Sequence, residues 1–144
     1  MYRPVAFVIL LVTLVPCRAN KTGIYAEFTS HAFGKQYVVA VTDNALEASP
    51  VWRDDAESPP VSARKAVKLA DALRVKLVKD SKDFKWKRES AEILFVDEPD
   101  RCLWHVHYEA HPVRGGETGI GPHLDLIVLM DGTILDPVVS GWNE

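Results

Sequence analysis

Residues 104–111, WHVHYEAH, alternate between apolar side chains and three histidines with one glutamate. Successive side chains of a β-strand point to opposite faces of the sheet, so this stretch predicts a strand with one apolar and one polar face. The apolar face, which includes Trp104 and Tyr108, has to pack against another layer. The polar face carries a row of ionisable groups, His105, His107, Glu109 and His111.

The chain around this strand predicts one helix followed by consecutive antiparallel strands. Apolar residues recur every three or four positions from Ala63 to about Lys79, and Ser62 before them is a natural N-cap. Strands are expected at residues 86–96, 103–111 and 123–130, and residues 133–139 continue as a hairpin partner or a short terminal strand. The fold class is therefore α+β, with one helix packed on an antiparallel sheet of three to four strands in two layers.

Three stretches resemble the PepSY domain of exported bacterial proteins and, more broadly, cystatin-type folds. They are SARKAVKLADALR, CLWHVHYEA and LDLIVLMDGTILDP, within residues 58–139. The family's usual Thr-Gly turn is Asp131-Gly132-Thr133 here, and the histidine row is no part of its signature. The resemblance implies a non-enzymatic, extracytoplasmic domain that binds or restrains other proteins, and it provides no active-site residues.

The first 19 residues have the layout of a secretory signal peptide. Arg3 precedes an uncharged run over residues 5–15, and Cys17-Arg18-Ala19 favours cleavage before Asn20. The alternative is a lipoprotein box ending at Cys17, which would then carry a lipid anchor. Both predict an exported protein, periplasmic, secreted or in the cell envelope, with no transmembrane span in the mature chain because the apolar run is short. Residues 20–57 are expected to form a β-prone segment and connector, and residues 58–144 the α+β domain.

The charge of the mature chain excludes two classes of partner. Removal of residues 1–19 leaves 15 basic residues against 20 acidic ones, a net charge of −5. A mildly acidic domain has no electrostatic footprint for nucleic acid or for anionic lipid. The remaining Cys102 stands beside Leu103 and Trp104, so we expect it to be buried.

Metal binding is one interpretation of the histidine row. Residues 105 and 111 lie roughly 20 Å apart along a strand at about 3.3 Å per residue, so the whole row cannot bind one ion. His105 and His107 form one chelating pair. If the apolar faces of the second and third strands coincide, one register places His111 opposite His123 and Glu109 opposite Asp125, whereas a two-residue slip keeps the faces but changes the partners. His111, His123 and Glu109 would then form a second set of ligands, and either set suits zinc or copper.

Two other interpretations stay open. An antiparallel sheet often has one solvated face, and histidines are acceptable there. The row could also form a pH-responsive binding surface, because imidazoles with pKa values near 6.5 gain charge together as the pH falls. Glu109 and Asp125 would partly offset that repulsion.

No catalytic signature appears in the chain, so we expect no enzyme. The glycine-rich loop over residues 114–121 lacks the Lys and Ser/Thr ending of a phosphate-binding loop. The sequence predicts a small exported domain that binds a protein or peptide through its open sheet face and this loop, with Arg114 and Asp125 at the contact surface. The alternative is a metal-binding protein or metal-dependent enzyme that uses the His-x-His strand. No cofactor other than zinc or copper is indicated.

Overall fold

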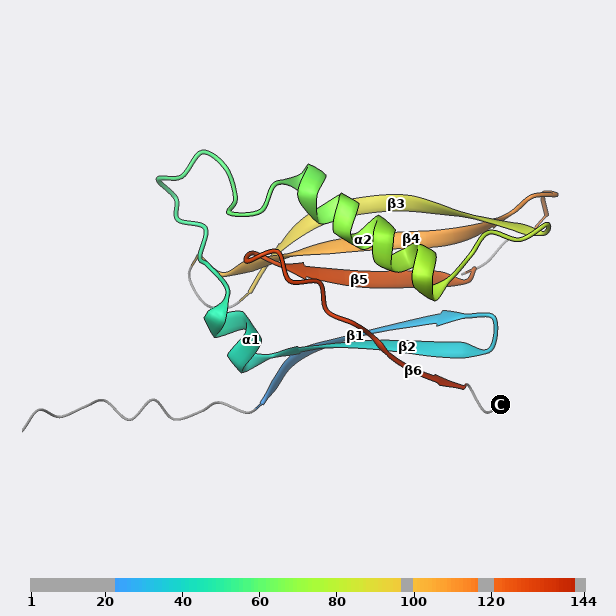
Figure 1. The fold of residues 1–144 in the computed structure, drawn as a ribbon, viewed down its shortest axis with the longest axis horizontal. Coiled ribbons are helices and arrows are strands. Elements are labelled where there is room, and N and C mark those ends of the chain that lie inside the picture. Colours follow the sequence, from blue (N-terminus) through green and yellow to red (C-terminus); the bar gives the residue numbers. More distant parts are fainter. Residues whose placement is uncertain (1–22, 97–99, 117–120, 142–144) are drawn as a thin grey trace, which may run out of the picture.

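A computed structural model describes residues 23–96, 100–116 and 121–141 of the chain. The predicted signal segment and Cys17 lie outside these residues. Two antiparallel three-stranded sheets and a few helices make up the described fold, in the arrangement of Figure 1. The first sheet has the order β1-β2-β6, with β1 Ile24–Ala32, β2 Lys35–Thr42 and β6 Val138–Gly141. The second has the order β3-β4-β5, with β3 Phe84–Phe95, β4 Cys102–Pro112 and β5 His123–Leu129, and the helices are α1 Asp43–Ala48 and α2 Ala63–Leu77.

Helix α2 lies across one face of the β3-β4-β5 sheet (Figure 1). The Ser62 hydroxyl accepts a hydrogen bond from the Lys65 backbone N–H at 3.3 Å, which confirms the predicted N-cap. The face that α2 buries is made of Ala66, Ala70 and Leu73. Two alanines let the helix backbone approach the sheet closely. The helix ends at Leu77, two residues before the predicted end, because Val78 already has an extended backbone.

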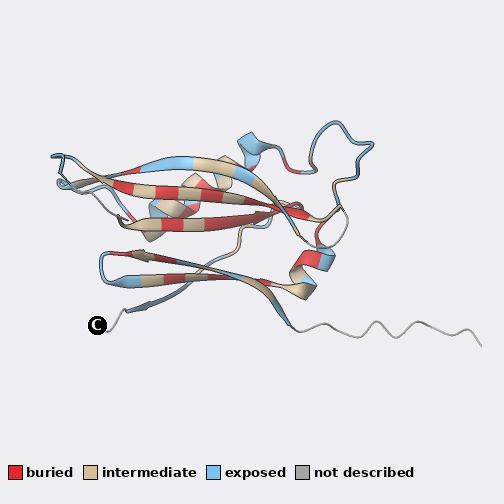
Figure 2. Ribbon diagram, turned by 180° about the vertical axis from the view of Figure 1, so that it is seen from behind, coloured by how far each residue is buried: buried red, intermediate tan, exposed pale blue. Residues whose placement is uncertain are grey.

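The predicted alternation of β4 is confirmed on this face. Trp104, Val106, Tyr108 and Ala110 are all buried, and they alternate with half-buried residues along the strand (Figure 2). Two hydrogen bonds fix the helical layer against them. The Trp104 indole donates to the Val61 carbonyl at 2.8 Å, and the Tyr108 hydroxyl donates to Asp71 of α2 at 2.7 Å.

The first sheet is built from both ends of the described chain. β1 and β2 form a hairpin whose turn residues, Phe33 and Gly34, both have positive φ, 50° and 74°. The segment predicted to be β-prone over residues 20–57 thus contains two full strands. β6 pairs with β2, so the C-terminal residues join this hairpin, and only an isolated bridge from Ile134 to Val128 extends the β5 side.

The β1-β2-β6 sheet adds packing that the predicted two-layer fold did not include. Leu103, Ile127 and Leu129 point away from α2, and they form a second core with Val39 and Val41 of β2. The expectation of an α+β fold is correct, but the protein is richer in sheet than one helix on one sheet. Part of the sheet face that was expected to be open is covered by the N-terminal hairpin.

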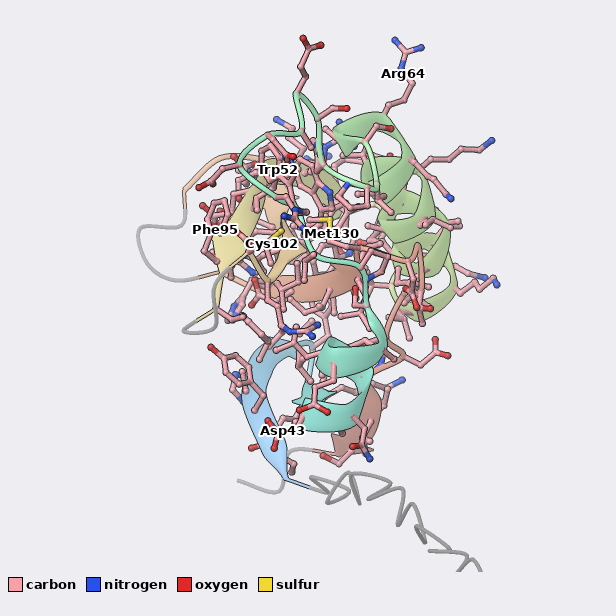
Figure 3. All side chains as sticks on the ribbon, turned by 90° about the vertical axis from the view of Figure 1, so that its left-hand side faces the viewer. Asp43, Trp52, Arg64, Phe95, Cys102 and Met130 are labelled. Carbon is pink, nitrogen blue, oxygen red and sulfur yellow. The ribbon has the colours of Figure 1, made fainter. Side chains whose placement is uncertain are left out.

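Cys102, the first residue of β4, lies in the interior beside Met130 (Figure 3). It belongs to the core cluster that includes Ala66 of α2. Its side chain is 1% exposed, which confirms the expected burial, and burial raises the pKa of its thiol. Within the described residues, no helix has both the length and the apolar character needed to cross a bilayer.

The packing of β5 against α2 gives a direct test of this fold. Leu126 is fully buried on the helical side, so Leu126→Ala should lower the free energy of unfolding by about 2–5 kcal/mol. Val75→Ala, on the exposed side of α2, should change it by less than about 0.5 kcal/mol. Urea unfolding followed by circular dichroism measures both. Equal losses from the two variants would contradict the assignment of faces.

Candidate metal centre

A β-bulge in β3 decides which of its acidic side chains face the histidine row. Lys87 pairs with Glu109 and Arg88 with Tyr108, but the next pair is Ser90 with His107, so Glu89 has no partner on β4. The extra residue shifts the alternation of the strand. Beyond it, Glu92 pairs with His105 and lies on the polar face, whereas unbroken alternation from Trp86 would place it under α2.

Three atoms that can act as metal ligands, two imidazole nitrogens and one carboxylate oxygen, converge at the centre of this face. Asp125 Oδ1 lies 2.8 Å from His105 Nε2 and 2.7 Å from His107 Nδ1. The register explains the contact, because His107 stands directly opposite Asp125 on β5 and His105 is its diagonal neighbour. All three donor atoms lie within 4.8 Å of one another. We call His105, His107 and Asp125 the inner triad.

Each member of the inner triad also has an outer partner. Glu92 accepts from His105 Nδ1 at 3.0 Å, and Glu109 accepts from His107 Nε2 at 3.2 Å. The Ser30 hydroxyl of β1 donates to Asp125 Oδ2 at 3.3 Å and accepts from the Asp125 backbone N–H at 2.7 Å. Such partners fix the orientation and the tautomer of the side chains that they contact.

The inner triad is shielded on the β5 side and open toward β3. The side chains of Asp125, His105 and His107 are 14%, 15% and 25% exposed, whereas those of Glu92 and Glu109 are 54% and 45% exposed. The Phe28 ring of β1 stacks on the His105 ring at a centroid distance of 5.4 Å. The N-terminal hairpin therefore covers the inner triad and leaves the outer carboxylates in contact with water.

The hydrogen bonds determine the protonation state of the two imidazoles. Carboxylates only accept, so each ring has to carry protons on both nitrogens to make both of its bonds. The hydrogen bond to Asp125, with that to Glu92, raises the pKa of His105 against the opposing effect of burial. Burial pulls the pKa of His107 down, but its bonds to Asp125 and Glu109 outweigh this and raise it. Burial acts to raise the pKa of Asp125, and the two imidazoles together lower it to about 2.

A second group of side chains that can act as metal ligands lies on the same face, at the side of β3. His111 Nε2 donates to Glu89 Oε1 at 2.6 Å, and donor atoms of Glu89, Glu109 and His111 all lie within 4.8 Å of one another. We call these three residues the outer group. Glu109 thus belongs to this group and is also the partner of His107.

The register between β4 and β5 differs by two residues from the one that would pair His111 with His123. Glu109 stands opposite His123, and His111 stands opposite Lys85 of β3. The predicted ligand set of His111, His123 and Glu109 is therefore divided: His111 goes with Glu89, and His123 lies beside His107 with ring centroids 6.0 Å apart. The same register continues beyond the paired residues, where the Ala110 N–H donates to the Pro122 carbonyl.

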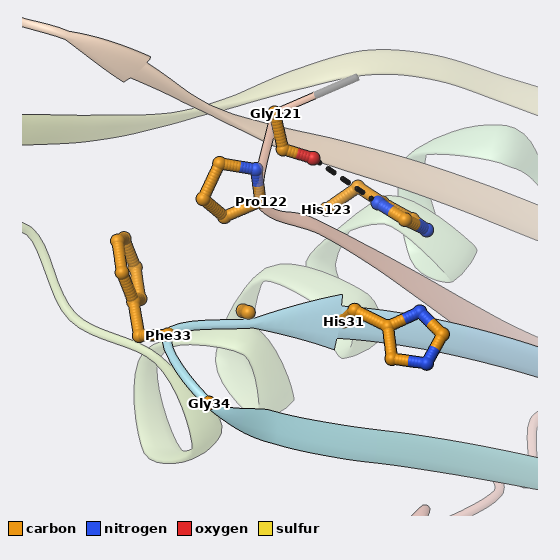
Figure 4. Close-up of a pocket in the computed structure, with 7 residues that line it drawn as sticks. His31, Phe33, Gly34, Gly121, Pro122 and His123 are labelled. Carbon is orange, nitrogen blue, oxygen red and sulfur yellow. Dashed lines mark hydrogen bonds between the residues drawn. The ribbon is translucent and has the colours of Figure 1, made fainter. Parts of the chain in front are cut away.

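His123 also borders a pocket of about 390 Å³ at the tip of the β1–β2 hairpin (Figure 4). His31 and Phe33 line it from the hairpin, and Gly121 and Pro122 line it from the start of β5. The His123 ring donates from Nδ1 to the Gly121 carbonyl at 3.2 Å, as the dashed line in Figure 4 shows. The glycine-rich loop thus ends at this pocket, while its residues 117–120 lie outside the described part.

The other predicted contact residues are divided between interior and surface. Asp125 is at the centre of the inner triad and mostly buried, so it does not form an open contact surface. Arg114 is exposed in the loop after β4, as expected.

The sequence indicated five residues of the inner triad and the outer group, which are His105, His107, Asp125, Glu109 and His111, but not Glu89, Glu92 or Ser30. The two glutamates were missed because nothing in Arg88-Glu89-Ser90 marks a bulge. Ser30 was missed because its contact joins positions 95 residues apart.

Comparison with protein-family models, with curated proteins and with solved structures gave no match for this chain. The resemblance to PepSY and cystatin-type domains stays a prediction.

The shared protons predict how stability depends on pH. The raised pKa values of His105 and His107 contribute stability that is complete below their usual value of 6.5 and is lost as the pH rises through the folded-state values. The lowered pKa of Asp125 contributes stability that is complete above 3.8 and is lost as the pH falls toward 2. The metal-free protein should therefore be most stable between about pH 4 and 6.5, which urea unfolding at a series of pH values measures.

Asp125→Asn is the variant that tests this origin. It should lower the free energy of unfolding at pH 6 by about 1–3 kcal/mol, because it removes the negative charge that two partly buried imidazoles share. It should also flatten the loss of stability above pH 6.5. Asp136→Asn, at an exposed position, is the control. If the free energy of unfolding of Asp125→Asn changed with pH in the same way as that of the wild type, Asp125 would not be the origin of the pH dependence.

Proposed function

We propose that this protein binds a divalent transition metal of the zinc or copper class at His105, His107 and Asp125. The observation that carries the proposal is the convergence of His105 Nε2 and His107 Nδ1 on Asp125 Oδ1. Zinc is bound by imidazole nitrogen and carboxylate oxygen at about 2.0–2.2 Å. The two N–O distances have to lengthen by only about half an ångström to suit ligands of one tetrahedral ion.

The outer partners of the triad support the same proposal. In metal sites a ligating imidazole usually gives its second N–H to a carboxylate or a carbonyl, which holds the ring and raises its basicity. Glu92 and Glu109 are placed for this role on His105 and His107. Ser30 holds Asp125 through its other oxygen. A coincidental contact on a solvated sheet face would not need a partner on the far side of every ligand.

Protons and metal compete for the same place in this arrangement. Without metal, one N–H proton lies between each imidazole and Asp125 Oδ1, and an ion bound there replaces both. Binding should therefore release about two protons below the folded-state pKa values and weaken steeply as the pH falls. Three protein ligands leave the fourth position of a tetrahedral zinc site to water or another donor. No reaction is assigned to that position.

Titration of tag-free protein with Zn²⁺ and Cu²⁺ tests the proposal. Calorimetry at pH 7.5 should give a tight binding event that His105→Ala and Asp125→Asn each weaken at least tenfold, since outer partners alone are worth about 10–100-fold in affinity. Repeating the titration in buffers with different ionisation enthalpies counts the released protons.

His31→Ala is the matched control, because it removes an imidazole of β1 outside the inner triad. Its affinity should equal that of the wild type. If zinc and copper both bind no more tightly to the wild type than to His105→Ala, the proposal is wrong.

Binding of a protein or peptide by a non-enzymatic exported domain is the second candidate. The N-terminal hairpin covers part of the sheet face that was expected to bind the partner. The pocket between the hairpin tip and Pro122 supports this candidate instead, because Phe33 at its edge is 55% exposed. If the protein binds neither zinc nor copper, this second candidate remains. Peptide capture by the wild type and by Phe33→Ser would test it, and the variant should capture less peptide.

A further inference from the structure

We infer that Glu89, Glu109 and His111 form a second, more exposed metal position beside the inner triad, so that the protein takes up two divalent ions on one sheet face. This inference deepens the proposed function and rests on it. The donor atoms of the outer group lie within 4.8 Å of one another, and its side chains come from two adjacent strands. A set of two carboxylates and one imidazole suits the same borderline metals as the inner triad.

The bulge at Glu89 is an independent reason to assign a role to this group. Deletion of Glu89 would leave Lys87, Arg88 and then Ser90 opposite consecutive residues of β4, so the sheet does not need the extra residue to keep its register. The bulge interrupts the ladder, and bulges commonly re-aim a side chain next to a functional site. Here it directs the Glu89 carboxylate onto His111, with Nε2 and Oε1 2.6 Å apart.

The charge on this face favours a second ion. Four carboxylates face the histidine row, those of Glu89, Glu92, Glu109 and Asp125. One divalent ion at the inner triad offsets two of these four negative charges, and two of the four carboxylates, those of Glu89 and Glu109, belong to the exposed outer group. Lys87, which stands opposite Glu109, offsets one of them and competes with a second ion.

Glu109 couples the two positions. Its Oε1 accepts from His107 Nε2 at 3.2 Å, and the same carboxylate belongs to the outer group. A carboxylate can contact an imidazole with one oxygen and a cation with the other. The ion at the outer group is therefore expected to bind more weakly than the inner one, because Glu109 is shared and the group is more exposed.

Zinc titration of the tag-free chain with three variants tests this inference. The wild type should bind two equivalents, the second at least tenfold more weakly than the first. His111→Ala and deletion of Glu89 should each abolish the second equivalent and change the first by less than about threefold. Lys87→Met should strengthen the second equivalent by about two- to fivefold, the effect expected from removing one exposed charge.

Matched measurements keep the outcomes distinct. His31→Ala should retain both equivalents, and unfolding midpoints establish that each variant is folded. A wild type with one equivalent, or a second equivalent that survives both His111→Ala and deletion of Glu89, overturns the outer position and leaves the inner triad intact. If Asp125→Asn loses the first, tight equivalent of zinc and keeps the second, weaker one, the two ions bind at separate positions. Absence of all binding overturns both proposals.

Discussion

The carboxylate of Asp125, shared by two imidazoles, is the interaction on which the rest of this site depends. Its Oδ1 contacts both His105 and His107, and its Oδ2 and backbone N–H both contact Ser30 of β1. One residue thus joins the middle of the β3-β4-β5 sheet to the N-terminal hairpin. The apolar contacts of Ile127 and Leu129 with Val39 and Val41 hold the hairpin in place beside it.

Partial burial makes this arrangement sensitive to the removal of any member. Charged groups withdrawn from water cost several kcal/mol each unless they are paired and hydrogen-bonded. Along the face the signs alternate from Glu92 through His105, Asp125 and His107 to Glu109, so every buried charge has an opposite neighbour. In the proposed metal site, a bound ion would replace the protons that make the imidazoles cationic. Under that proposal, protons and a metal ion would compete for this place, and the pH would select between them.

The sequence predicted the elements better than their connections. Strict alternation over residues 104–111 identifies a strand with one buried face, and Ser62 identifies the start of α2, because both are local patterns. The hairpin register was undetermined, since the pattern repeats every two residues and permits a two-residue slip. That slip separates His111 from His123 and brings His107 opposite Asp125. The bulge at Glu89 and the long-range contact of Ser30 depend on tertiary packing and left no local pattern to recognise.

The protonation state of His105 and His107 tests the account most directly. Imidazole ¹⁵N NMR of the metal-free protein over a series of pH values should show both nitrogens of each ring keeping their protons to a pH above the usual imidazole pKa of 6.5. Addition of one equivalent of Zn²⁺ should then shift His105 Nε2 and His107 Nδ1, while the nitrogens that face Glu92 and Glu109 keep their protons. Neutral single tautomers in the metal-free protein, or zinc-dependent shifts at His123 in place of these two residues, would contradict it.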